Sequence, residues 1–273
     1  MKLSEIRAKI NIKYFMVGYL GLLLVVSSFY APVSAVAYLP AGISIVLLYS
    51  LFDLAWTRVH DGVWYLPVSS WISGLVLSVV ALTGPSVIQV IVLPMLAVLS
   101  KHLFHFGKSR HVWNPAAFAM AVLSLFTPAV SWWAMSWGVL PLVLVSIAGL
   151  FILWRLNRWD VTLPFLGSFA LFLVLFFGPG SVGLFLASGP VVFFATVMLV
   201  EPITSSFPTR RDRVVYGVLV GLFAAGVSLV ERLFPQVTLD PLIVGLLLGN
   251  LTASLVFLPS LKIVSNSNIT KQV

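Results

Sequence analysis

The chain has few charged residues and no cysteine. Of its 273 residues only 9% are Asp, Glu, Lys or Arg, whereas a soluble domain carries about 25%. It is 60% hydrophobic, its mean hydropathy is +1.08, and no polar stretch reaches the length of a soluble domain. This composition excludes a soluble globular protein and predicts a polytopic, all-α membrane protein.

Several chemistries are excluded by what is missing. Without cysteine the chain alone forms no disulfides, thiolate zinc sites or protein-ligated iron–sulfur clusters. It lacks a Walker loop, a GxGxxG fingerprint, an HExxH pair and a GxSxG elbow, which argues against ATPases, soluble-type dehydrogenases, zincins and serine hydrolases. The net charge of +8 is explained by cytoplasmic loops, so no nucleic-acid partner is expected.

What is present is a series of ten apolar segments. A spanning helix needs about 20 such residues, and the candidate spans are 14–32, 35–56, 65–83, 85–104, 114–127, 132–154, 161–178, 181–200, 214–230 and 241–261. With the N-terminus in the cytoplasm, all 16 Lys and Arg residues except Arg232 fall on the cytoplasmic side. This bias supports ten spans in the inner membrane of a cell, with both termini cytoplasmic.

A faint internal repeat divides this single transmembrane domain, residues 1–273, into halves of about 14–127 and 132–261. The fifth span opens with Asn114-Pro115 and the tenth with Asp240-Pro241, each a favoured N-cap followed by a proline suited to the first helical turn. Because five is odd, the halves would be inverted, and inverted repeats place binding sites near the midplane at interrupted helices.

Two acidic residues in or beside the apolar runs leave alternatives open. Asp53 in the second span either faces a cavity or partner, or pairs with Arg58 at interface depth. Glu201 and Thr204 follow the eighth span; they either form a polar site or simply end a helix at Pro202. Hydroxyl groups that either line a cavity or bond their own backbone belong to Ser70, Ser73, Ser188 and Thr196.

A basic cluster precedes the fifth span. Cationic neighbours repel metal ions, so a metal site is not expected here, and an anion such as a phosphate or lipid headgroup is the more plausible partner. The alternative is plain headgroup contact by a basic loop. The cluster consists of Lys101, His102, His105, Lys108, Arg110 and His111.

Two motifs of the chain resemble the RnfD/NqrB family. Members of that family are membrane components of Rnf electron-transport complexes and of the sodium-pumping NADH:quinone oxidoreductase. That family's Lys-x-x-Phe-Gly-Gly-x-Gly-x-Asn-x-x-Asn-Pro-Ala stretch is matched here at Lys101, Phe104, Gly107, Asn114, Pro115 and Ala116. Its Ala-Thr-Asp-Pro-Val-Thr-Ser stretch, followed by a basic turn and Tyr-Gly, is matched at Glu201, Pro202, Thr204, Ser205, Tyr216 and Gly217, with Glu in place of Asp. The resemblance implies two inverted five-span halves and flavin-dependent electron transfer with flavoprotein or iron–sulfur partners.

The resemblance also implies where a flavin would be held. In the family, FMN is esterified to a Thr of a Ser-Gly-Ala-Thr motif in the outer loop after the Asn-Pro-Ala helix; here that loop reads TPAVS, so covalent FMN is not expected. Two alternatives stay open: a non-covalent flavin, FMN or riboflavin, near a helix N-terminus that favours anionic groups, or no cofactor at all. The candidate cofactor-binding or cavity-lining residues are Lys101, Arg110, Asn114, Ser73, Thr196, Glu201 and Thr204.

Three functions remain open on the sequence. The first is a redox component of a multi-protein complex. The second is a transporter or channel for flavin or another small solute, because inverted repeats and broken helices are also transporter features. The third is a membrane anchor for a redox partner.

Overall fold

The computed structural model describes all residues except 1–10, 31–34, 85, 107–109, 237–238 and 270–273. The described chain is helical apart from one short β-hairpin. The helices of the N-terminal half are α2 (Ile12–Tyr30), η1 (Ala35–Ala37), α3 (Tyr38–Asp61), α4 (Val68–Val80), α5 (Val87–Leu103) and α6 (Pro115–Ser124). Those of the C-terminal half are η2 (Trp133–Met135), α7 (Val139–Leu156), α8 (Trp159–Phe177), α9 (Pro179–Leu186), α10 (Gly189–Phe193), η3 (Phe194–Met198), α11 (Pro202–Ser205), α12 (Arg210–Leu233) and α13 (Pro241–Ile269).

Helix length and composition suit a membrane. Among the described residues, five helices are long and apolar enough to cross one: α2, α3, α7, α8 and α12. Large apolar side chains such as Leu47 on α3 and Leu175 on α8 remain 64% and 69% exposed, a surface that lipid would cover. The predicted helical, membrane-type fold is thus confirmed. The remaining apolar helices are shorter, and ten spans stay a prediction.

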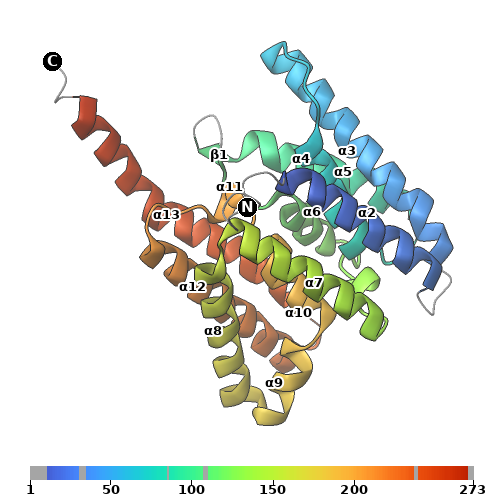
Figure 1. The fold of residues 1–273 in the computed structure, drawn as a ribbon, viewed down its shortest axis with the longest axis vertical. Helices are drawn as coiled ribbons and strands as arrows, with labels where there is room; N and C mark the ends of the chain where they lie inside the picture. The colour runs from blue at the N-terminus through green and yellow to red at the C-terminus, as the bar shows by residue number, and fades with distance from the viewer. Residues whose placement is uncertain (1–10, 31–34, 85, 107–109, 237–238, 270–273) are drawn as a thin grey trace, which may run out of the picture.

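The helices fall into two groups whose packing partners recur in the same order. In the first group α3 packs against α4 and α5, α5 against α6, and α2 against α4. In the second, α8 packs against η3 and α12, α12 against α13, and α7 against α10. Figure 1 shows the first group, blue to teal, on one side of the molecule and α8, α9, α12 and α13 on the other. Helices α6 and α13 contact each other where the groups meet.

The predicted caps of the fifth and tenth spans are confirmed. The side-chain oxygen Oδ1 of Asn114 accepts a hydrogen bond from the backbone N–H of Ala117 at 3.0 Å, and Oδ1 of Asp240 accepts one from Ile243 at 2.9 Å. Each cap satisfies an otherwise unpaired amide in the first helical turn.

The segment predicted as one span, 181–200, is instead broken into pieces. α9 ends at Leu186, and a new helix begins after Ser188, whose hydroxyl accepts from the amide of Val191 at 3.4 Å. α10 then widens into the π-helical turn η3. Such turns add a residue to a helix and are frequent at functional sites.

Before α6 the chain also forms the antiparallel hairpin of β1 (His105–Phe106) and β2 (Arg110–His111), which the sequence did not predict.

Candidate functional site

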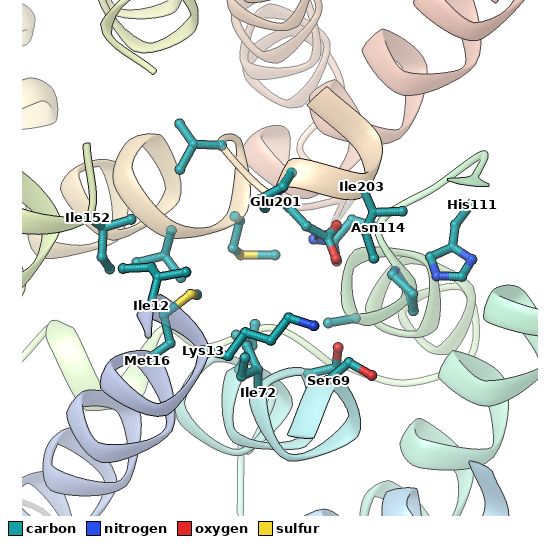
Figure 2. A pocket seen from close by; sticks show the side chains of 18 of the residues that line it. Ile12, Lys13, Met16, Ser69, Ile72, His111, Asn114, Ile152, Glu201 and Ile203 are labelled. Atoms are coloured by element: carbon teal, nitrogen blue, oxygen red, sulfur yellow. Dashed lines mark hydrogen bonds between the residues drawn. The ribbon is translucent and has the colours of Figure 1, made fainter. Parts of the chain in front are cut away.

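A cavity of about 200 Å³ lies where the two helix groups meet. Its walls come from α2, α3, α4, α5 and α6 on one side and from α7, η3 and α11 on the other. Aliphatic side chains such as Ile72 and Ile152 form the apolar part (Figure 2). Its polar part is made by Lys13, Tyr49, Ser69, Ser73, Lys101, His111, Asn114 and Glu201. An apolar pocket with a few convergent polar groups is the usual form of a small-molecule site.

The two halves are joined at the cavity wall by Asn114 and Glu201. The amide Nδ2 of Asn114 donates to Oε2 of Glu201 at 3.0 Å, and the hydroxyl of Thr204 donates to the same oxygen at 3.2 Å. The side chain of Asn114 therefore makes two contacts: its Nδ2 donates to Glu201, and its Oδ1 caps α6. Figure 2 shows the carboxylate of Glu201 facing the cavity, opposite Lys13 and Ser69.

The ionisation of this wall is set mainly by burial. Glu201 lies past the end of the apolar helix Gly189–Met198, and burial raises the pKa of its carboxyl to about 7, against the hydrogen bonds from Thr204 and Asn114 that lower it. Burial, assisted by the charge of Lys101, lowers the pKa of His111 to about 4. Near neutral pH the wall therefore holds a neutral imidazole and a partly protonated carboxyl.

The raised pKa of Glu201 makes a testable contribution to stability. The folded protein binds the Glu201 proton more tightly than the unfolded chain does. The resulting stabilisation of the folded state is therefore complete below the pKa that Glu201 has in the unfolded chain, and it is lost as the pH rises toward about 7. Glu201→Gln keeps the acceptor for Asn114 but cannot ionise. Thermal unfolding should show the variant more stable than wild type at about pH 8 and similar at about pH 4.5. Equal pH profiles for the two proteins would contradict the assignment.

Lys101 reaches the cavity from a buried ionic network centred on Asp53. The carboxylate of Asp53 is fully buried; Oδ2 accepts from Nζ of Lys101 at 2.6 Å, and Oδ1 bonds Nε2 of His102 at 2.6 Å. The hydroxyls of Tyr65 and Ser70 also donate to Oδ2. The pairing with Arg58 that the sequence allowed is wrong: Arg58 donates to the backbone oxygen of Gly62 at 2.7 Å.

Two cavity residues were missed by sequence reasoning. Tyr49 is 1% exposed, and its hydroxyl interacts with Ser73 on the same cavity wall. Lys13 near the start of α2 extends into the cavity (Figure 2). Neither had a distinguishing signal, since Tyr49 lies in an apolar run and Lys13 resembles an ordinary cytoplasmic-side cation.

The remaining predicted site residues occupy different places. Ser73 is on the cavity wall. Thr196 is not among the lining residues: its hydroxyl donates to the backbone of Val192 at 2.7 Å, and its side chain packs where Gly149 leaves room. Arg110 contacts the end of α11 and Ser206 rather than the cavity.

Comparison of the chain with models of known protein families gave no match, and comparison with curated protein sequences gave none either.

Proposed function

We propose that the chain is an inner-membrane protein of ten spans in two inverted five-helix halves, with both termini in the cytoplasm. Support comes from the packing order: the pairs α3·α4, α3·α5, α5·α6 and α2·α4 of the first helix group have counterparts in the second, each formed by the elements five spans later. The matched caps Asn114 and Asp240 stand at the start of the fifth and tenth elements. The asymmetric distribution of Lys and Arg supports the orientation.

We infer that it acts as the membrane component of a flavin-dependent electron-transport system of the Rnf type, with flavoprotein or iron–sulfur partners. One observation carries this proposal. The two sequence motifs that resemble the family are 87 residues apart, yet they meet on one cavity wall through the bond between Asn114 and Glu201. Lys101 of the first motif reaches the same cavity. Residues with only local structural roles have no reason to converge on a pocket.

The cavity suits a flavin ring system held without a covalent bond. The ring has an apolar edge and a hydrogen-bonding edge, and the cavity has an aliphatic part and a polar part. Its volume of about 200 Å³ is below the range of about 300–1,000 Å³ typical for whole drug-sized ligands, so the ribityl chain would extend outside it. The loop after α6 is held to the turn after α4 by Ser131, whose hydroxyl donates to the backbone oxygen of Leu82 at 2.6 Å, and it carries no Ser-Gly-Ala-Thr motif.

The absorbance spectrum and intact mass of the purified protein test this proposal. We expect a flavin spectrum, release of the flavin on denaturation, and a denatured chain at the unmodified mass. Asn114→Leu should weaken flavin binding at least about tenfold, because it removes one of the two donors to Glu201 and puts an apolar side chain on the polar part of the cavity wall. Asn114→Ser keeps the helix cap but loses the amide donor, so it separates misfolding from lost binding. Absence of flavin from the chain, alone and with its partners, would refute the proposal.

A transporter for flavin or another small solute is the second candidate. The small volume of the cavity and the break between α9 and α10 favour it, because interrupted helices line the substrate sites of transporters. Riboflavin uptake into proteoliposomes that is lost in Asn114→Leu would select this candidate. Flavin that stays bound through purification, without any flux, would select the redox component.

A further inference from the structure

Two arginines from different parts of the chain converge on the C-terminal end of α11 and on Ser206, which follows it. Arg110, on strand β2, donates from Nη1 to the backbone oxygen of Ser206 at 2.7 Å and from Nη2 to that of Thr204 at 3.1 Å. Arg158, between α7 and α8, donates to the hydroxyl of Ser206 and, at 3.5 Å, to the backbone oxygen of Ser205. Both guanidinium groups therefore lie beside the same residue, Ser206.

Within the described residues neither guanidinium forms an ion pair with a carboxylate. All four acceptors are neutral, as is the ring of Phe207, whose centroid lies 4.6 Å from the guanidinium carbon of Arg110. Burial, together with the charge of Arg158, lowers the pKa of Arg110. Of the five guanidinium donors, the buried Nε–H of Arg110 has no partner within the described residues. Burying half of a cation with an unpaired N–H donor costs free energy unless an anion lies beside the cation and accepts that hydrogen bond.

One acidic group acts on Arg158, and it is already engaged. Asp160 accepts from Nε of Arg213 at 2.7 Å and also acts on Arg158, which Arg213 repels. Arg158 and Arg213 thus share this carboxylate, whereas the charges that shift the pKa of Arg110 do not include it. The contrast with Lys101 is informative, because that cation is paired directly with Asp53 at 2.6 Å.

Carbonyl capping alone does not account for this arrangement. Arg58 is an arginine that only caps a carbonyl. Its guanidinium donates to the backbone oxygen of Gly62 at 2.7 Å and lies 5.7 Å from the ring centroid of Trp64. It does so in an exposed position and without a second arginine. At Ser206 two like charges are brought together under partial burial, which Coulomb repulsion opposes unless a negative group lies between them.

We propose that Arg110 and Arg158 form a binding site for a phosphate group. Guanidinium forks donate paired hydrogen bonds to phosphate oxygens, and a phosphate can carry enough negative charge to offset two arginines. The phosphate belongs either to a lipid headgroup at the cytoplasmic face or to a free phosphate or phosphate monoester. The site is separate from the cavity wall, so it stands whether or not a flavin binds there.

Thermal unfolding of the detergent-purified wild-type protein is the first test and needs no variant. We expect sodium phosphate to raise Tm saturably, whereas sodium chloride at the same ionic strength does not. Native mass spectrometry then distinguishes the sources: a retained phospholipid indicates a headgroup, and protein free of lipid but stabilised by phosphate indicates the free anion. No phosphate stabilisation together with no retained phospholipid would overturn the proposal.

Matched variants locate the effect. Arg158→Gln and Arg110→Lys should each weaken the phosphate response about tenfold or more, the second because lysine keeps the charge but loses the fork. Arg58→Gln, which removes an arginine that caps a carbonyl without a partner arginine, should leave the response unchanged. An equal loss in all three variants, or a loss in none, would show that phosphate acts on the general positive charge of the protein and would exclude this site.

Discussion

Replacing Asp53 with leucine should destabilise the protein by about 3–5 kcal/mol, the cost of leaving buried charges without their partner. The carboxylate of Asp53 is fully buried and accepts from Lys101, His102, Tyr65 and Ser70. It therefore holds α3, α4, α5 and the segment between α3 and α4 together. Its removal leaves the ammonium of Lys101 unpaired beside the cavity. The measurement is thermal unfolding of the purified variant, followed by tryptophan fluorescence.

Asp61 provides the matched control, because it is an exposed acid at the end of the same helix. Asp61→Leu should change stability by less than about 0.5 kcal/mol. The double variant Asp53→Leu with Lys101→Met removes both charges and should recover part of the loss, since replacing a whole buried ion pair costs less than breaking it. If Asp53→Leu and Asp61→Leu were equally stable, the ionic network would have no structural importance.

Local features could be predicted from the sequence, because their physics involves neighbouring residues only. The caps at Asn114 and Asp240 are readable from the Asn-Pro and Asp-Pro pairs. The apolar runs predicted most of the helices, with three exceptions: α7 begins at Val139 and not at 132, α13 continues to Ile269 and not to 261, and at Ser188 a capping hydroxyl and Pro190 break the predicted eighth span. A run of apolar residues alone does not show such a break, because both pieces stay hydrophobic.

Long-range partners could not be predicted in the same way. The position of Asp53 in an apolar run indicated a partner, but the nearest cation in sequence, Arg58, is not the one that the fold brings to it. The joining of Asn114 to Glu201 depends on how the two helix groups meet. A family resemblance suggested that both residues matter, without indicating that they touch.

The sequence also contains a pattern that indicates close helix packing and that the predictions did not use. Gly217 and Gly221 on α12 are four residues apart, as are Gly245 and Gly249 on α13. This small-xxx-small spacing lets helix backbones approach closely in membranes. An added Cβ on Gly217 would lie 2.3 Å from the backbone oxygen of Val161 on α8. The absence of a side chain at Gly217 therefore allows α12 to pack closely along α8.

Gly217→Val and Gly221→Val should each be strongly destabilising, by about 3 kcal/mol or more, because the added atoms meet the backbone of α8, and at Gly221 also the hydroxyl of Ser168. A Cβ at Gly221 would lie 2.1 Å from the hydroxyl of Ser168 and 2.7 Å from the backbone oxygen of Phe165. Helices α8 and α12 would have to separate, which disrupts the C-terminal helix group. We expect a large fall in Tm or loss of folded protein on size-exclusion chromatography.

Gly226 supplies the control on the same helix. A Cβ there has no heavy atom within 4 Å, so Gly226→Val carries the same change of residue type, and the same effect on helix propensity, without the clash. Its Tm should stay close to that of wild type. Truncating the neighbour gives a second check: Ser168→Ala should recover part of the loss in Gly221→Val but none of that in Gly217→Val, whose clash is with Val161. A similar Tm for all the glycine variants would mean that α8 and α12 are not held at the spacing that these glycines permit.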